Sequence, residues 1–184
     1  MKKEMDSGTR IAKDLDQAKK IVRIFKQGGW NAVLPAGLSL YQEVETRFGS
    51  TFLMARQFVK ALSSVQTVIQ SKSHQEASDS FDKLMLVRNA DNSVSTAPAL
   101  NAVVEVFQSV CHMQTAMEAR TYPTLHKLLP MLTDMKEQIS SLCEKSVHAT
   151  SQVSQSAYTK RLAKHVKQEL DQIEIHDLWT VALK

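Results

Sequence analysis

Long stripes of apolar residues at helical spacing, with few residues to interrupt them, constrain what this chain can fold into. Apolar side chains recur every three or four positions, as at Ile11, Leu15, Ala18, Val22 and Phe25, and this spacing places them on one face of a helix. The 184 residues include only 5 Gly and 4 Pro, whereas an all-β sandwich or barrel needs many tight turns. The sequence therefore predicts an all-α fold, a single-domain multi-helix bundle.

Capping and helix-breaking residues predict where the helices begin and end. Gly28-Gly29 should end the first helix, and Ser50 should cap a second, long helix that continues to Ile69. Pro130 should kink or split the helix in which it falls, because it removes one backbone donor. Further helices are expected over 81–89, from Pro98 after a Thr96 cap, from Pro123 after a Thr121 cap, over 158–173 and over 175–183.

Polar stretches predict the domain organisation. We expect a flexible N-terminal segment over 1–10, followed by one helical domain over 11–184, a length that suits a single core. Runs rich in Ser, Thr, Asn and Asp predict loops near 71–80, 90–97 and 147–156.

Composition limits the cellular context. The two cysteines, Cys111 and Cys143, are too few for a disulfide-stapled scaffold and indicate a reducing compartment. No apolar run is long enough to cross a bilayer, and the first residues lack the apolar core of a signal peptide. We therefore expect cytosol or nucleus and no membrane association. A net charge of +4 is compatible with an acidic partner, nucleic acid included.

Candidate catalytic and metal-binding groups do not form a known pattern. The spacing of Cys111-His112 and of Cys143 with His148 matches no structural zinc site, and no third residue accompanies them as in a nucleophilic pair. Asp14 and Asp16 lie at i and i+2, on different helix faces, so they cannot hold one metal together. The sequence predicts no catalytic residue, no metal and no cofactor, and hence a protein that is not an enzyme.

Four blocks of the sequence resemble one protein family. The run from Gln42 to Phe52 (QEVETRFGSTF) resembles the V-x-T-R-W-x-S-T signature of hAT-family (hobo/Activator-type) DNA transposases and of host proteins descended from them. Three further blocks resemble the family in the same order: 18–26 (AKKIVRIFK) followed by Leu34, 115–125 (TAMEARTYPTL) followed by Pro130, and 175–183 (IHDLWTVAL). The resemblance spans nearly all of the chain.

The resemblance implies an origin and a function. It matches the all-helical domain inserted into the family's RNase H-like catalytic core, whose metal-binding acidic residues lie outside these blocks. The family's Arg-Trp pair corresponds to Arg47 and Phe48, and Phe48 keeps a face for base stacking but loses the indole donor. This departure implies a domesticated descendant, a segment of a nuclear zinc-finger host protein.

Three sets of residues are candidates for contact with a partner, each with a plainer alternative. The family motif (Thr46, Arg47, Phe48, Ser50 and Thr51) would contact DNA, or else form a helix cap beside a core aromatic residue. Two basic faces would follow a phosphate backbone, or simply keep helices solvated: Lys19, Arg23 and Lys26, and Lys160, Arg161, Lys164 and Lys167. Apolar Trp30, Leu34, Leu178 and Trp179 would bind another protein, or pack in the core.

These observations lead to two hypotheses. The first is a non-catalytic protein-interaction module that binds a nuclear, chromatin- or transcription-associated protein. The second is a DNA-binding helical domain that contacts phosphates through Arg47 and the basic faces. Self-association into a homo-oligomer is compatible with both.

Overall fold

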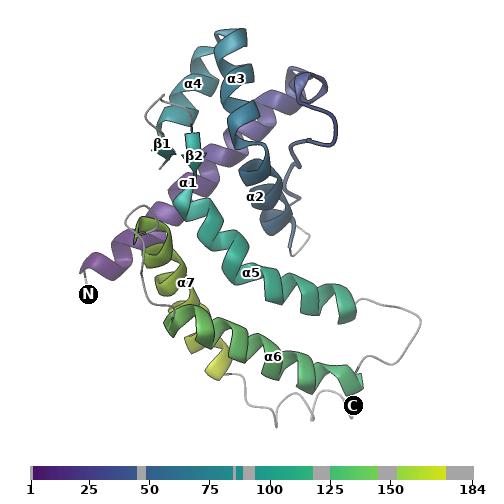
Figure 1. Ribbon diagram of the computed structural model, residues 1–184, viewed down its shortest axis with the longest axis vertical. Helices are drawn as coiled ribbons and strands as arrows, with labels where there is room; N and C mark the ends of the chain where they lie inside the picture. Colours follow the sequence, from purple (N-terminus) through teal and green to yellow (C-terminus); the bar gives the residue numbers. More distant parts are fainter. Residues whose placement is uncertain are drawn as a thin grey trace. The chain divides into compact units, whose positions relative to one another are not determined.

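Helices make up most of the structure. The computed structural model describes residues 2–44, 49–84, 86–88, 94–117, 125–144 and 153–172. Its helices are α1 (Lys2–Gln27), the 3-10 helix η1 (Trp30–Val33), α2 (Ser50–Lys60), α3 (Leu62–Lys72), α4 (Gln75–Asp82), α5 (Pro98–Met117), α6 (Leu125–Glu144) and α7 (Val153–Asp171) (Figure 1). The two strands, β1 (Val87–Arg88) and β2 (Val94–Thr96), pair as a small antiparallel hairpin. The all-α class is confirmed.

The chain forms two compact units, where the sequence led us to expect one domain. Unit 1 covers Met1–Val104 and unit 2 covers Glu105–Lys184, with the boundary inside α5. Each unit has its own cluster of buried apolar side chains. Helical periodicity identifies which face of a helix is buried but not which helices share a core, so the division could not be predicted from it.

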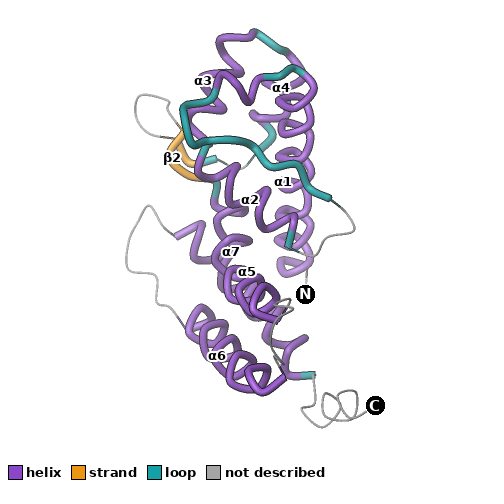
Figure 2. Tube along the Cα trace, turned by 90° about the vertical axis from the view of Figure 1, so that its right-hand side faces the viewer, coloured by secondary structure: helices purple, strands orange, loops and turns teal. Residues whose placement is uncertain are grey.

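The core of unit 1 lies where α2 and α4 pack against α1 (Figure 2). Phe25 of α1 and Phe58 of α2 are both completely buried in it. The hairpin packs against α3: the backbone N–H of Val94 donates to Gln66 Oε1 at 3.0 Å, and the Val94 side chain is buried. Unit 1 is therefore built from helices that meet through aromatic and branched side chains.

Unit 2 is centred on α6 and α7, which pack against each other. Its buried cluster contains Val106, Leu132, Met135, Ile139, Ala163 and Leu170. Thr159 Oγ1 of α7, also buried, donates to Glu105 Oε2 at 2.7 Å. α6 continues through Pro130 and is not split there, since proline removes only one backbone donor from a long helix.

Several predicted boundaries are correct. The first helix ends at Gln27, before Gly29, which has the left-handed φ of 67° expected at a helix end. α5 begins at Pro98 as predicted. Thr96, however, belongs to β2, so Ala97 and not Thr96 immediately precedes the helix.

Other predicted boundaries are wrong. α1 begins at Lys2, so the segment expected to be flexible over 1–10 is helical from residue 2. The helix predicted over 50–69 is divided at Ala61, whose φ and ψ of −93° and 4° are not helical. The predicted 147–156 loop overlaps α7 from Val153, and its other residues, like the predicted 175–183 helix, lie outside the described residues.

The polar stretch 71–80 contains most of a helix. α3 continues to Lys72 and α4 begins at Gln75, because the His74 ring accepts a hydrogen bond from the Ala77 backbone N–H at 3.3 Å and caps the new helix. α4 ends at Asp82 and β1 follows, so the helix predicted over 81–89 is wrong. The loop predicted over 90–97 includes β2.

Among the helices of the described ranges, none combines the length and apolarity needed to span a membrane.

Candidate functional site

The segment that leads into α2 is attached to the rest of unit 1 by side-chain hydrogen bonds. The Asn31 side chain accepts from the Leu40 N–H at 3.1 Å and donates to the Leu40 carbonyl at 3.3 Å. A side-chain amide bonded in this way makes the two hydrogen bonds that the backbone of a neighbouring strand would make. The Leu40 side chain is buried in the core, so both its backbone and its side chain are held.

Glu43 joins this segment to two helices. Its carboxylate lies 2.7 Å from Lys19 Nζ of α1 and accepts a hydrogen bond from Thr51 Oγ1 of α2. Burial alone would raise the pKa of Glu43, but the hydrogen bonds from Lys19 and Thr51 and the charge of Lys19 outweigh it and lower the pKa below its ordinary value. The charged form of Glu43 is therefore the one that stabilises unit 1.

Ser50 closes the segment onto the start of α2. The Val44 N–H donates to Ser50 Oγ at 3.2 Å, and Ser50 Oγ donates to the Val44 carbonyl at 2.8 Å. Gly49 has a φ of 81°, a left-handed value that a side chain would strain. We call Val44, Gly49 and Ser50 the Ser50 clasp. It holds together the two ends of residues 45–48, which lie outside the described residues.

The family motif is thus only partly described. Thr46, Arg47 and Phe48 lie outside the described residues. Ser50 is only 3 % exposed and its hydroxyl is bonded to Val44, while the Thr51 hydroxyl is bonded to Glu43. The N-cap of α2 is Gly49, so the prediction that Ser50 caps the helix is wrong. Both hydroxyls are engaged with residues of the preceding segment, and neither caps the helix.

The two predicted basic faces are located in different units. On α1, Arg23 and Lys26 are exposed, whereas Lys19 pairs with Glu43. On α7, Arg161 and Lys164 are exposed and Lys160 and Lys167 are half-buried. The α7 stretch over 157–168 contains no Asp or Glu, and neither does the α1 stretch over 17–27, but on α1 Lys19 is paired with Glu43.

Two members of the predicted apolar interaction face are described, and both pack within unit 1, which is the plainer alternative. Leu34 is buried in the core of unit 1. Trp30 is half-buried, and its ring centroid lies 5.3 Å from that of Phe25 and 5.3 Å from that of His74, in edge-on contacts. Both residues pack inside unit 1 because Gly28 and Gly29 allow the chain to turn back after α1. Leu178 and Trp179 lie outside the described residues.

Three large apolar side chains of the described residues are exposed, and two of them, Val44 and Leu53, were not predicted to be. Val33 is 53 %, Val44 41 % and Leu53 40 % exposed. Val44 belongs to the Ser50 clasp, and Leu53 lies three residues, about one helical turn, after Ser50. The signal was present for Leu53, because it falls outside the apolar stripe of its helix.

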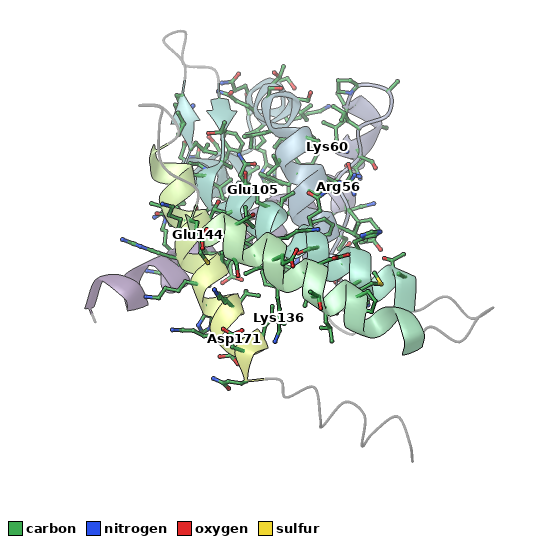
Figure 3. The ribbon with its side chains drawn as sticks, turned by 60° about the horizontal axis from the view of Figure 1, so that its bottom comes forward. Arg56, Lys60, Glu105, Lys136, Glu144 and Asp171 are labelled. Atoms are coloured by element: carbon green, nitrogen blue, oxygen red, sulfur yellow. The ribbon has the colours of Figure 1, made fainter. Side chains whose placement is uncertain are left out.

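Leu53 also begins an exposed row along α2. Leu53, Arg56 and Lys60 are all exposed, at positions i, i+3 and i+7 of one helix, and such positions lie on one side. Figure 3 labels Arg56 and Lys60, both on α2. We call these three residues the α2 stripe. Its apolar member is next to the clasp and its two basic members are in the second half of the helix.

The other chemically notable groups are dispersed. Asp14 is buried and lies 3.1 Å from Arg10 Nε, whereas Asp16 is exposed, so the two carboxylates face apart as predicted. Cys111 is half-buried, and burial raises the pKa of its thiol. Within the ranges that the structure describes, no three His, Cys, Asp or Glu side chains are grouped so that they could hold a metal ion.

Comparison with known proteins adds no candidate residue to these. No protein-family model matches the chain, and a search of curated proteins finds no match. The Ser50 clasp and the α2 stripe are the features of unit 1 that combine a fixed backbone with exposed, chemically distinct side chains. Such an arrangement is suited to binding.

Proposed function

We propose that this chain is a non-catalytic protein-interaction module of a nuclear, chromatin- or transcription-associated protein, derived from the helical domain of an hAT transposase. The observation that supports it is the exposure of Val44, whose backbone is bonded to the buried Ser50 hydroxyl, and of Leu53, which lies three residues after Ser50. In this proposal the two apolar side chains are covered by another protein.

The fixed backbone beneath these side chains is what distinguishes them. A single exposed apolar residue is ordinary on any protein surface. Val44, however, is bonded through both its N–H and its carbonyl, and Leu53 belongs to a helix that begins at the clasp. This chain loses little conformational entropy when a partner covers these side chains, because their backbone is already ordered.

The proposed origin is supported by the sequence resemblance. The clasp holds both ends of the segment that contains Thr46, Arg47 and Phe48, the part of the motif that departs from the family at Phe48. Both cysteines are unpaired, in keeping with the reducing compartment that a nuclear protein occupies.

A capture experiment tests this proposal. The immobilised chain, a Leu53→Glu variant and a matched Gln70→Glu control at another exposed helical position are exposed to nuclear extract, and bound proteins are quantified by mass spectrometry. We expect specific proteins to be retained by the wild type and the control and lost from Leu53→Glu. Identical retention by all three would contradict the proposal, provided that circular dichroism shows all three folded.

A second function, DNA binding, is favoured by one observation. The α7 stretch over 157–168 carries Lys160, Arg161, Lys164 and Lys167 without an acidic residue. If these residues contact phosphates, duplex DNA should bind at low salt, and the affinity should fall steeply as salt rises. Arg161→Glu/Lys164→Glu should abolish this binding in a gel-shift titration, whereas Lys13→Glu should not. No binding at low salt would exclude this function.

A further inference from the structure

We infer that the α2 stripe binds an acidic protein segment that presents a large apolar side chain beside its carboxylates. This inference rests on the proposed function and specifies the chemistry of the partner. The stripe is an exposed row of one apolar and two basic residues, Leu53, Arg56 and Lys60.

The geometry of the stripe is that of one narrow helix face. At 100° per residue the three side chains fall within an arc of about 60°, and the rise from Leu53 to Lys60 is about 10 Å. At the apolar end, the Val44 side chain is also exposed, and the Val44 backbone is bonded to Ser50, one turn before Leu53. One short helix or extended segment can therefore cover the whole row.

The positive charges of the stripe are not neutralised within the described part of the chain. Neither Arg56 nor Lys60 forms an ion pair with another described residue. α2 contains no Asp or Glu, and the carboxylate of Glu43 is occupied by Lys19 and Thr51. Lys60 interacts favourably with the carboxyl end of its own helix, but Arg56, a turn earlier, has less of this benefit. Both remain available for a carboxylate of the partner.

The apolar end of the row indicates a protein and not a nucleic acid. A phosphate backbone would match Arg56 and Lys60, but it would offer Leu53 and Val44 no apolar surface. A protein segment with an apolar residue one helical turn from two acidic residues matches both ends of the row.

Selection from a displayed library of random 12-residue peptides tests the inference on the complete chain. We expect the enriched peptides to be acidic and to carry a large apolar residue three or four positions from a carboxylate. Their affinity should fall at least tenfold with Leu53→Glu and with Arg56→Glu/Lys60→Glu. Lys20→Glu, an equal charge change at an exposed position of α1, should leave it unchanged. Peptides with Lys in place of Glu should recover binding to Arg56→Glu/Lys60→Glu.

The possible failures are distinguishable. Neutral apolar peptides that depend on Leu53 but not on Arg56 and Lys60 would overturn the acidic partner and leave the proposed function intact. Acidic peptides that bind equally well without an apolar residue would overturn the inference in favour of unspecific electrostatics. No enrichment, or enrichment that does not depend on Leu53, would overturn the inference, while the capture experiment with Leu53→Glu decides separately on the proposed function.

Discussion

Replacing Ser50 with alanine tests whether the clasp is what orders the segment before α2. The change removes two hydrogen bonds, from the Val44 N–H at 3.2 Å and to the Val44 carbonyl at 2.8 Å. Each contributes about 0.5–1.5 kcal/mol net. Because the Val44 side chain is 41 % exposed, water can reach part of the vacated backbone. We therefore expect a loss of about 1–2 kcal/mol.

The loss should appear first as local opening of the segment and not only as a lower melting temperature. Trypsin cleaves after arginine, and Arg47 lies in sequence between Val44 and Ser50 of the clasp. Because a protease binds an extended stretch of chain longer than 45–48, cleavage there requires the clasp to open. A loss of about 1–2 kcal/mol corresponds to an open population about 5–30 times larger. Cleavage after Arg47 should accelerate by that factor when opening is faster than cleavage.

Limited proteolysis followed by mass spectrometry measures the rate at Arg47, and urea unfolding measures the global free energy. Ser63→Ala, an exposed serine on α3, is the matched control and should change the free energy of unfolding by less than about 0.5 kcal/mol. Equal cleavage rates for Ser50→Ala, Ser63→Ala and the wild type would refute the role assigned to the clasp.

Three further predictions concern the ties within each unit. Glu43→Gln should lower the free energy of unfolding at pH values above the ordinary carboxyl pKa of 4.5. The difference in unfolding free energy between variant and wild type should close as pH falls through the lowered folded-state pKa of Glu43. Urea titrations at about pH 7 and about pH 3 would measure it, and a pH-independent difference would contradict this prediction. Phe58→Ala should cost about 3–5 kcal/mol in the same assay, because Phe58 is completely buried in the core of unit 1, and a cost below about 1 kcal/mol would contradict that placement. Thr159→Val should cost about 1 kcal/mol through loss of the bond to Glu105, and an equal loss in a Glu105→Ala background, where no acceptor remains, would exclude that bond as the cause.

The long helices could be predicted from sequence because their signals are local. The stripe from Ile11 to Phe25 and the glycines after it define α1 up to its end. α4 was missed because its inward side consists largely of small residues, Ala77 and Ser80, with Phe81 at its end. The break at Ala61 was missed because neither glycine nor proline marks it.

The candidate site was less predictable because its contacts link residues that are distant in sequence. Lys19 was grouped with Arg23 and Lys26 by helical spacing, but its side chain forms an ion pair with Glu43, which periodicity cannot identify. The motif predicted hydroxyl donors at Ser50 and Thr51, yet both hydroxyls bond to the segment that precedes them. Spacing predicts which face a side chain occupies, whereas the path of the connecting segment decides what it meets.

This internal use of polar groups bears on what the site can bind. The hydroxyls of Ser50 and Thr51, the amide of Asn31 and the carboxylate of Glu43 are all engaged within unit 1. They would have to break those bonds before they could hold a small polar ligand or a phosphate, at a cost of about 1–3 kcal/mol for each buried group left unsatisfied. The outward side of α2 requires no such rearrangement, because Leu53, Arg56 and Lys60 are exposed as they stand. A ligand that supplies its own carboxylates and its own apolar surface therefore binds at the lower cost, and a protein segment is the ligand that supplies both.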